Sequence, residues 1–181
     1  MQRQYSPFDQ LIVWGEKAIN LFAGVPDASR PSPAEGYLEN TLSDQERKLS
    51  ANLLRVDHAG EVCAQALYIG HAFTAKNPDI KAHMLNAAQE EVDHLAWCAQ
   101  RLIELGDHVS YLNAVWYAGS FAIGALSGLC GDKWNLGFVA ETENQVEAHL
   151  KSHLSLLPRE DEKSRHILLK MKEDEIKHAR E

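Results

Sequence analysis

Two Glu-x-x-His tetrads are the part of this sequence best suited to chemistry. They run from Glu91 to His94 and from Glu175 to His178. Residues three positions apart share one face of an α-helix, so each tetrad can direct a carboxylate and an imidazole at the same point. One such tetrad is a weak signal, because surface helices contain this spacing by chance. The interpretation therefore depends on further carboxylates elsewhere in the chain.

A lone glutamate precedes each tetrad at a similar distance. Glu61 lies 30 residues before Glu91, and Glu143 lies 32 residues before Glu175. Four helices that supply Glu, Glu-x-x-His, Glu and Glu-x-x-His provide the ligands of a dinuclear iron or manganese site. Carboxylates can bridge two cations, and two imidazoles leave coordination positions open for dioxygen. The predicted metal ligands are Glu61, Glu91, His94, Glu143, Glu175 and His178.

The expected arrangement pairs each lone glutamate with one histidine. Glu61 and His94 would bind one metal, Glu143 and His178 the other, and the two tetrad glutamates would bridge them. The third helix leaves an alternative open, because Glu141 and Glu147 lie close to Glu143 and Glu147 shares its face one turn later.

Each tetrad is preceded by a further acidic residue, Glu90 or Asp174. Metal-bound histidines usually donate their second N–H to a carboxylate or carbonyl. We expect Asp174 to orient His94 and Glu90 to orient His178, each from the helix opposite, although both carboxylates could instead be solvated charges.

Other polar residues lie close to the predicted ligands in sequence. Asp57 lies one turn before Glu61 and is expected either in a hydrogen-bonded shell or paired with Arg55. His149 is expected near the metal ligands, and with His153 it forms an i, i+4 pair that could bind a metal, although the sequence offers no third ligand. The remaining histidines are expected at the surface or hydrogen-bonded.

Composition favours one globular domain of 181 residues, 45 % of them hydrophobic. The net charge of −8 argues against nucleic-acid binding, because phosphates repel an acidic surface. The three cysteines, Cys63, Cys98 and Cys130, form no Cys-x-x-Cys motif, and we expect all of them to be small buried side chains in a reducing compartment.

Start and stop signals outline four ligand-bearing helices. A capping box at 43–46 opens a helix to about residue 73, and Asn77-Pro78 opens a second that ends before Gly106. The third should cover about 133–157 and the fourth should begin near residue 160. This pattern predicts an all-α, ferritin-like four-helix bundle with a long crossover between its two helix pairs.

The crossover, residues 109–131, contains no charged side chain. Its simplest interpretation is a buried bundle helix, with Gly124 and Gly128 allowing another helix to approach closely. The second interpretation of this segment is a lipid-facing helix on a peripheral protein, and the last is a transmembrane helix.

The N-terminal part is expected to hold a helical segment that packs on the main body, or that lies as a short helix on a membrane surface. Residues 1–36 would hold an amphipathic segment and a proline-rich linker, and residues 37–181 the bundle. The amphipathic spacing lies over residues 8–22, and the segment is too short and too charged for a secretory signal.

Four segments resemble the demethoxyubiquinone hydroxylases of ubiquinone biosynthesis over about residues 40 to 181. They are Leu54-Arg-Val-Asp-His-Ala-Gly-Glu61, Glu90-Glu-Val-Asp-His-Leu95, Val139-Ala-Glu-Thr-Glu143 and Asp174-Glu-Ile-Lys-His178. The resemblance implies a ferritin-like di-iron monooxygenase that uses O2 to hydroxylate the ring of a polyprenyl methoxy-benzoquinol. The six ligands named above carry over, with no catalytic residue beyond them.

The resemblance also implies the surroundings of such an enzyme. We expect two Fe ions, an external reductant such as NADH, and a peripheral position on the cytoplasmic side of a bacterial membrane. Expected partners are other ubiquinone-biosynthesis proteins, including a lipid-binding one, and further copies of the chain. Family members usually continue with another hydrophobic helix after the position of His178, so we expect either a truncated chain or a tail that is missing from this sequence. The alternative of another class is a ferritin-like iron-oxidising or iron-storage bundle, which shares the ligands.

Overall fold

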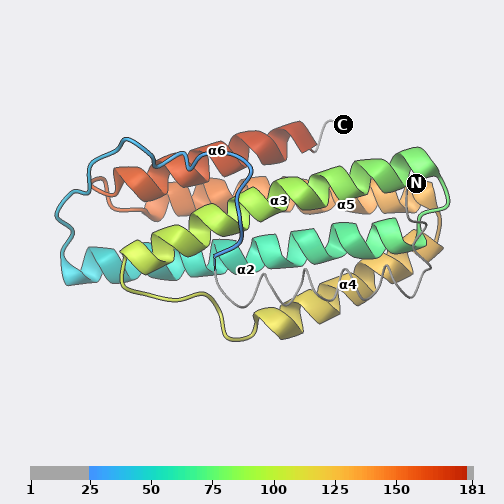
Figure 1. The fold of residues 1–181 in the computed structure, drawn as a ribbon, viewed down its shortest axis with the longest axis horizontal. Coiled ribbons are helices and arrows are strands. Elements are labelled where there is room, and N and C mark those ends of the chain that lie inside the picture. The colour runs from blue at the N-terminus through green and yellow to red at the C-terminus, as the bar shows by residue number, and fades with distance from the viewer. Residues whose placement is uncertain (1–24, 179–181) are drawn as a thin grey trace, which may run out of the picture.

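The described part of the chain is built from α-helices joined by short connections. The computed structural model describes residues 25–178, without the side chains of 132–136, and has no strand in that range. The predicted all-α bundle is therefore confirmed (Figure 1). The amphipathic segment predicted at 8–22 lies outside the described residues, and the domain division stays a prediction. The helices are α2 (Asp44–Thr74), α3 (Pro78–Glu104), α4 (Asn113–Leu129), α5 (Asp132–Leu156) and α6 (Glu162–His178).

Local sequence signals explain where these helices begin and end. Ser43 caps α2, and its side chain and backbone exchange hydrogen bonds with Glu46 in the predicted capping box. Asn77 caps α3, with Pro78 in the first turn. Gly106 and Gly131, with φ of 76° and 111°, follow α3 and α4 in a conformation that glycine adopts without strain. All four predicted ligand-bearing helices are present to within a few residues.

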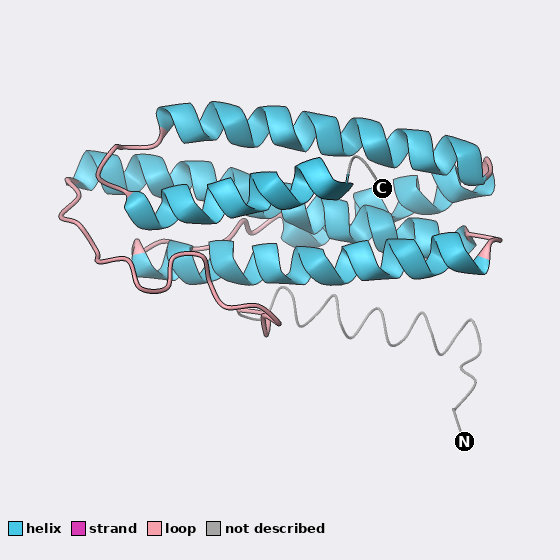
Figure 2. Cartoon of the chain, turned by 90° about the horizontal axis from the view of Figure 1, so that it is seen from above, coloured by secondary structure: helices cyan, strands magenta, loops and turns pink. Residues whose placement is uncertain are grey.

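The helices form two antiparallel pairs with a helical crossover between them. α2 packs on α3, α5 packs on α6, and α3 also contacts α6. Figure 1 shows α4 lying alongside α2 and running in the same direction, so that α5 begins at the end of the bundle where α2 ends. Seen from above in Figure 2, the long helices lie nearly parallel to one another. This is the topology that the repeated helix pairs predicted.

Glycine allows α4 to pack closely against α2. A Cβ atom on Gly124 would overlap the carbonyl oxygen of Leu67, and one on Gly70 would overlap the carbonyl oxygen of Phe121. A backbone contact of this kind excludes every side chain at these two positions. The close approach predicted from the Gly-x-x-x-Gly spacing is therefore confirmed.

The prediction that α4 is a buried bundle helix was wrong. Within it only Asn113, Gly124 and Gly128 are buried, because α4 packs mainly on α2 and no helix of the described chain covers its outer face. Large apolar side chains cover the outer face of this region, namely Tyr111, Leu112, Val115, Trp116, Ile123, Leu126 and Leu129. Among the described helices, none is long and apolar enough to cross a bilayer.

The cysteines differ from expectation at one position. Cys98 is buried and Cys63 is half-buried, but Cys130 is exposed. Cys130 directly follows the last turn of α4, at the exposed point where the chain turns toward α5. The apolar pattern around it came from the outer face of α4, not from a buried one.

Candidate metal centre

The six predicted ligands lie between two apolar clusters of the bundle. One cluster contains Leu54, Leu102 and Met171, and the other contains Tyr68 and Met84. Along α2, Glu61 falls between Leu54 and Tyr68, and along α3, Glu91 falls between Met84 and Leu102. None of the six ligand side chains is more than 8 % exposed. The bundle thus holds four carboxylates and two imidazoles in its interior, where water cannot solvate them.

His94 lies at the centre of the first group of ligands. Its Nδ1 is 3.1 Å from Oε2 of Glu91, 3.4 Å from Oε1 of Glu175 and 3.6 Å from Oε2 of Glu61. The ligand atoms of these four residues all lie within 4.8 Å of one another. Donors from α2, α3 and α6 therefore surround a space of the size that one metal ion occupies.

The second group shares Glu175 with the first. Glu143, Glu175 and His178 also have ligand atoms within 4.8 Å of one another. Nδ1 of His178 lies 3.7 Å from Oε1 of Glu91, whose other oxygen faces His94. Glu91 and Glu175 thus lie between the two histidines, where the sequence interpretation put the bridging carboxylates.

Among the candidates on α5, burial distinguishes Glu143 from its neighbours. Glu143 is buried, whereas Glu141 is exposed and Glu147 is half-exposed. Glu141 accepts a hydrogen bond from the Gln145 side chain on the outer surface. Only Glu143 belongs to a group of potential ligands.

The buried carboxylates lack the partners that a metal-free core would need. Oε2 of Glu61, Oε1 of Glu91, Oε2 of Glu143, both Oε atoms of Glu175 and Nδ1 of His178 are buried without a hydrogen bond among the described residues. Burial, with the charge of Glu91, raises the pKa of Glu61 to about 8 and that of Glu175 well above its usual range. A pair of divalent cations would satisfy these atoms, so the residues fit the predicted metals.

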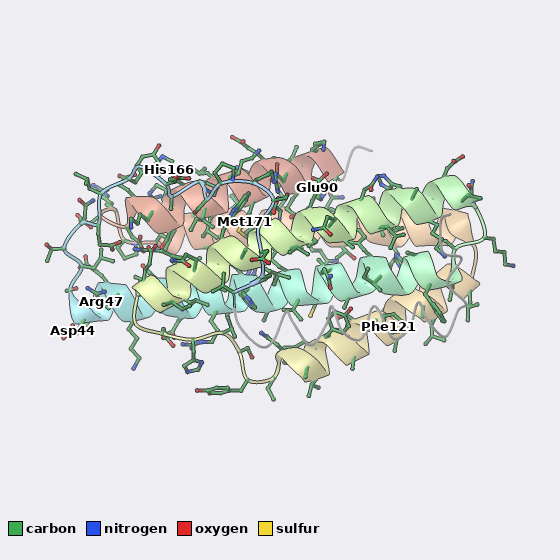
Figure 3. The ribbon with its side chains drawn as sticks, viewed as in Figure 1. Asp44, Arg47, Glu90, Phe121, His166 and Met171 are labelled. Carbon is green, nitrogen blue, oxygen red and sulfur yellow. The ribbon has the colours of Figure 1, made fainter. Side chains whose placement is uncertain are left out.

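The acidic residue before each tetrad contacts a histidine of the other tetrad. Nε2 of His94 lies 3.1 Å from Oδ2 of Asp174, and Nε2 of His178 lies 2.9 Å from Oε2 of Glu90. Figure 3 shows Glu90 on α3 where that helix faces α6. Each imidazole thus turns Nδ1 toward the interior and Nε2 toward a carboxylate. Burial would raise the pKa of Asp174, but hydrogen bonds from His94, Lys170 and Arg30 lower it, so this carboxylate stays charged.

An extended segment before α2 supplies a residue that the sequence interpretation missed. The guanidinium of Arg30 lies 2.5 Å from Oδ2 of Asp93 and 2.8 Å from Oδ2 of Asp174, and it stacks over the Trp97 ring. The backbone N–H of Ser29 donates to Asp93 at 2.6 Å. Arg30 therefore links α3 to α6 beside the carboxylate that holds His94. No periodic pattern marks an arginine in a loop, so only the tertiary structure reveals it.

Asp57 and His149 lie together in a group of potential ligands that contains none of the six predicted ones. Nε2 of His149 is 3.5 Å from Oδ1 of Asp57, and Nδ1 of His153 is 2.8 Å from the same oxygen. His149 is grouped with Asp57 and His153, not with the six predicted ligands. The alternative pairing of Asp57 with Arg55 was wrong, because Arg55 turns outward and pairs with Asp107.

One further histidine contradicts the expectation of surface or hydrogen-bonded residues. His58 and His71 are both fully buried, but Nδ1 of His58 lies 3.4 Å from Nδ2 of Asn113 in a hydrogen bond, whereas both ring nitrogens of His71 lack a hydrogen bond among the described residues. Burial lowers the pKa of each to about 4, so both are neutral at pH 7. The rings of His71 and Phe138 make an edge contact, so a side chain of α5 contributes to the burial of this histidine.

A cavity of about 450 Å³ reaches the first group of ligands. α2 contributes Asp57 and Glu61 to its wall, α4 contributes Trp116, and α5 contributes Val146 and His149. Its lining is mainly apolar, and its volume falls in the range of small-molecule sites. The cavity therefore gives a molecule of moderate size access to Glu61 from the side that α4 borders.

The comparisons with known proteins agree on one family. Residues 48–181 match the model of a family described as ubiquinone biosynthesis protein COQ7. A 3-demethoxyubiquinol 3-hydroxylase of Xanthomonas euvesicatoria is 53 % identical over 98 % of this chain and 82 % of its own length. A 3-demethoxyubiquinol 3-hydroxylase of Polynucleobacter necessarius is 55 % identical over 96 % of this chain and 84 % of its own. The chain is an enzyme, and it belongs to the COQ7 family of ubiquinone biosynthesis proteins.

Proposed function

We propose that this enzyme is a di-iron monooxygenase that uses O2 to hydroxylate the ring of a polyprenyl methoxy-benzoquinol, a demethoxyubiquinol. One observation carries the proposal: four carboxylates and two imidazoles from four helices meet in the interior, and each of them except His94 has a buried ligand atom without a hydrogen bond among the described residues. The relatives named as 3-demethoxyubiquinol 3-hydroxylases supply the substrate class.

Two irons bound by the six ligands would supply the redox chemistry, in which one oxygen atom of O2 enters the ring and the other leaves as water. The chain determines where the metals sit and what surrounds them. Asp174 and Glu90 hold Nε2 of His94 and His178, so that each Nδ1 points toward the ligand carboxylates, where it would bind a metal. Two divalent cations balance the charge of the four ligand carboxylates, so loading relieves the cost of their burial.

The cavity beside Glu61 is the proposed position of the quinol ring. Val56, Cys63, Trp116 and Val146 provide its apolar wall and exclude water from the reacting face. Thr142, Gln145 and His149 are the polar groups on the α5 side that can meet the ring oxygens. Because the cavity reaches the surface beside α4, the polyprenyl tail would leave along that helix.

The outer face of α4 is the proposed membrane contact. It has no charged side chain, and it exposes Leu112, Val115, Ile123, Leu126 and Leu129 to the surroundings. An apolar face of this extent, with Tyr111 and Trp116 near one end, suits a helix that lies in the lipid interface. The enzyme would then take its substrate directly from the cytoplasmic face of the bacterial membrane.

The remaining expectations extend the same proposal. An external reductant, with NADH as the first to test, would deliver the two electrons. Other ubiquinone-biosynthesis proteins, one of them lipid-binding, and further copies of this chain would be its partners. The iron-storage alternative shares the ligands but gives no role to the cavity beside Glu61 or to the uncharged face of α4.

A single-turnover experiment tests the function. Iron-loaded protein is reduced without oxygen, mixed with a short-tailed demethoxy-quinol and then exposed to O2. We expect up to one hydroxylated ring per chain, detected by mass spectrometry, with little product from Glu175→Ala. The matched control is Glu173→Gln, an exposed neighbour, which should match the unsubstituted chain. Iron oxidation without any ring product would contradict the proposal.

A further inference from the structure

The further candidate site lies between α2 and α5, where the structure supplies the third ligand that the sequence lacked. His149 and His153 are one turn apart on α5, a spacing that places two imidazoles on one helix face. Asp57 on α2 faces both of them, and the three ligand atoms lie within 4.8 Å of one another. The donors are Nε2 of His149, Nδ1 of His153 and Oδ1 of Asp57.

Asp57 is buried without an aligned partner. Only 2 % of the residue is exposed, and neither carboxylate oxygen accepts a hydrogen bond among the described residues. Nδ1 of His153 lies 2.8 Å from Oδ1 of Asp57, but neither atom makes an aligned hydrogen bond among the described residues. Burial raises the pKa of this carboxyl group, against the opposing effect of the neighbouring His153. A carboxylate in this position needs a cation or a proton.

The spacing of the donors suits a tetrahedral metal ion. Ligand bonds of about 2.0–2.1 Å put neighbouring donor atoms about 3.3 Å apart in a tetrahedral site. The distances to Oδ1 of Asp57, 2.8 Å from Nδ1 of His153 and 3.5 Å from Nε2 of His149, bracket that value. Two imidazoles and one carboxylate form a donor set that zinc and other late first-row divalent ions accept, with a fourth position for water or an external ligand.

We infer that Asp57, His149 and His153 form a mononuclear site for a divalent transition-metal ion of the zinc type, separate from the six-ligand centre. Asp57 and His149 both line the cavity that Glu61 lines, so the fourth position faces that cavity. An oxygen atom of a molecule in the cavity could reach the ion there. The inference concerns metal binding alone and does not depend on the proposed hydroxylation.

Cobalt is a suitable probe, because tetrahedral Co²⁺ with nitrogen and oxygen ligands absorbs in the visible range. Iron-loaded protein of measured iron content is titrated with Co²⁺, and the bound cobalt is counted after dialysis. We expect one cobalt per chain in addition to the iron, with tetrahedral absorption bands. In His149→Gln the affinity should fall by more than the roughly 10- to 100-fold that loss of an outer-shell partner costs.

Variants separate this site from other cobalt binding. His149 has a side chain that is 45 % exposed, so its replacement by glutamine should leave the fold intact. Asp57→Asn tests the buried donor, and His83→Gln on α3 is the matched control outside the ligand groups. The inference is overturned if no cobalt binds beyond the iron. It is equally overturned if the bound cobalt has the same affinity in His149→Gln and Asp57→Asn as in His83→Gln.

Discussion

Arg30 offers the most specific test of how the structure holds the metal centre. In Arg30→Met the side-chain stem can still cover Trp97, but the charges facing Asp93 and Asp174 are lost. The side chains of these two acids are only 2 % and 7 % exposed, whereas that of Arg30 is 32 % exposed. Removing one partner from a buried ion pair costs about 3–5 kcal/mol, and an exposed pair contributes about 0–1 kcal/mol.

The expected loss lies between these limits. Asp93 keeps its hydrogen bonds from Ser29, and Asp174 keeps those from His94 and Lys170, so neither acid is left alone. We therefore expect the free energy of unfolding to fall by about 2 kcal/mol. For a protein of this size that corresponds to a decrease in Tm of about 4–8 °C.

The assay is thermal and urea unfolding of the metal-free protein. Arg159→Met is the matched control, because Arg159 is exposed and a surface change of this kind stays within about 0.5 kcal/mol. If both variants unfold at the same temperature and urea concentration, the contact of Arg30 with the two acids contributes nothing and this reasoning fails.

Three other predictions follow from the same structure. Asp174→Asn should weaken iron binding about 10- to 100-fold, because a neutral amide holds Nε2 of His94 less well than a carboxylate does. Competition with a chelator measures the iron affinity, and an affinity equal to that of Glu173→Gln would refute this prediction. Gly124→Val should destabilise the protein by several kcal/mol, because the new side chain overlaps the Leu67 backbone. The control is Gly119→Val, at an open position on the same helix. Equal Tm values for the two variants would contradict the close packing. The metal-free protein should lose stability as the pH rises from about 4.5 toward 8. The pKa of Glu61 is near 8 when folded and near 4.5 when unfolded, so only the folded state holds this proton across the range. Urea unfolding at several pH values measures this, and stability that rises with pH over this range would contradict it.

The sequence predicted the features that depend on local spacing. The capping box at Ser43, the Asn77-Pro78 start and the helical period around Glu91 are each determined within a few residues, so the helices could be placed without a structure. The repeated interval from lone glutamate to tetrad then indicated which helices face one another.

Contacts between distant segments were harder to predict. Arg30 lies in an extended segment and meets α3 and α6 only after folding, so no pattern indicated its role. The burial of His71 beside Phe138 depends on how α2 and α5 meet in the folded chain, and the exposure of α4 depends on which faces its neighbours cover. Asp57 completes the histidine pair of α5 for the same reason, since the two helices are adjacent only in the folded chain.

The central claim is that six side chains bind two adjacent irons, and Mössbauer spectroscopy of the ⁵⁷Fe-loaded oxidised protein tests it most directly. With iron counted per chain, the account predicts two ferric ions that couple through their bridging ligands into a diamagnetic ground state. Isolated paramagnetic iron, or iron content and spectra unchanged in Glu91→Ala and Glu175→Ala, would contradict it.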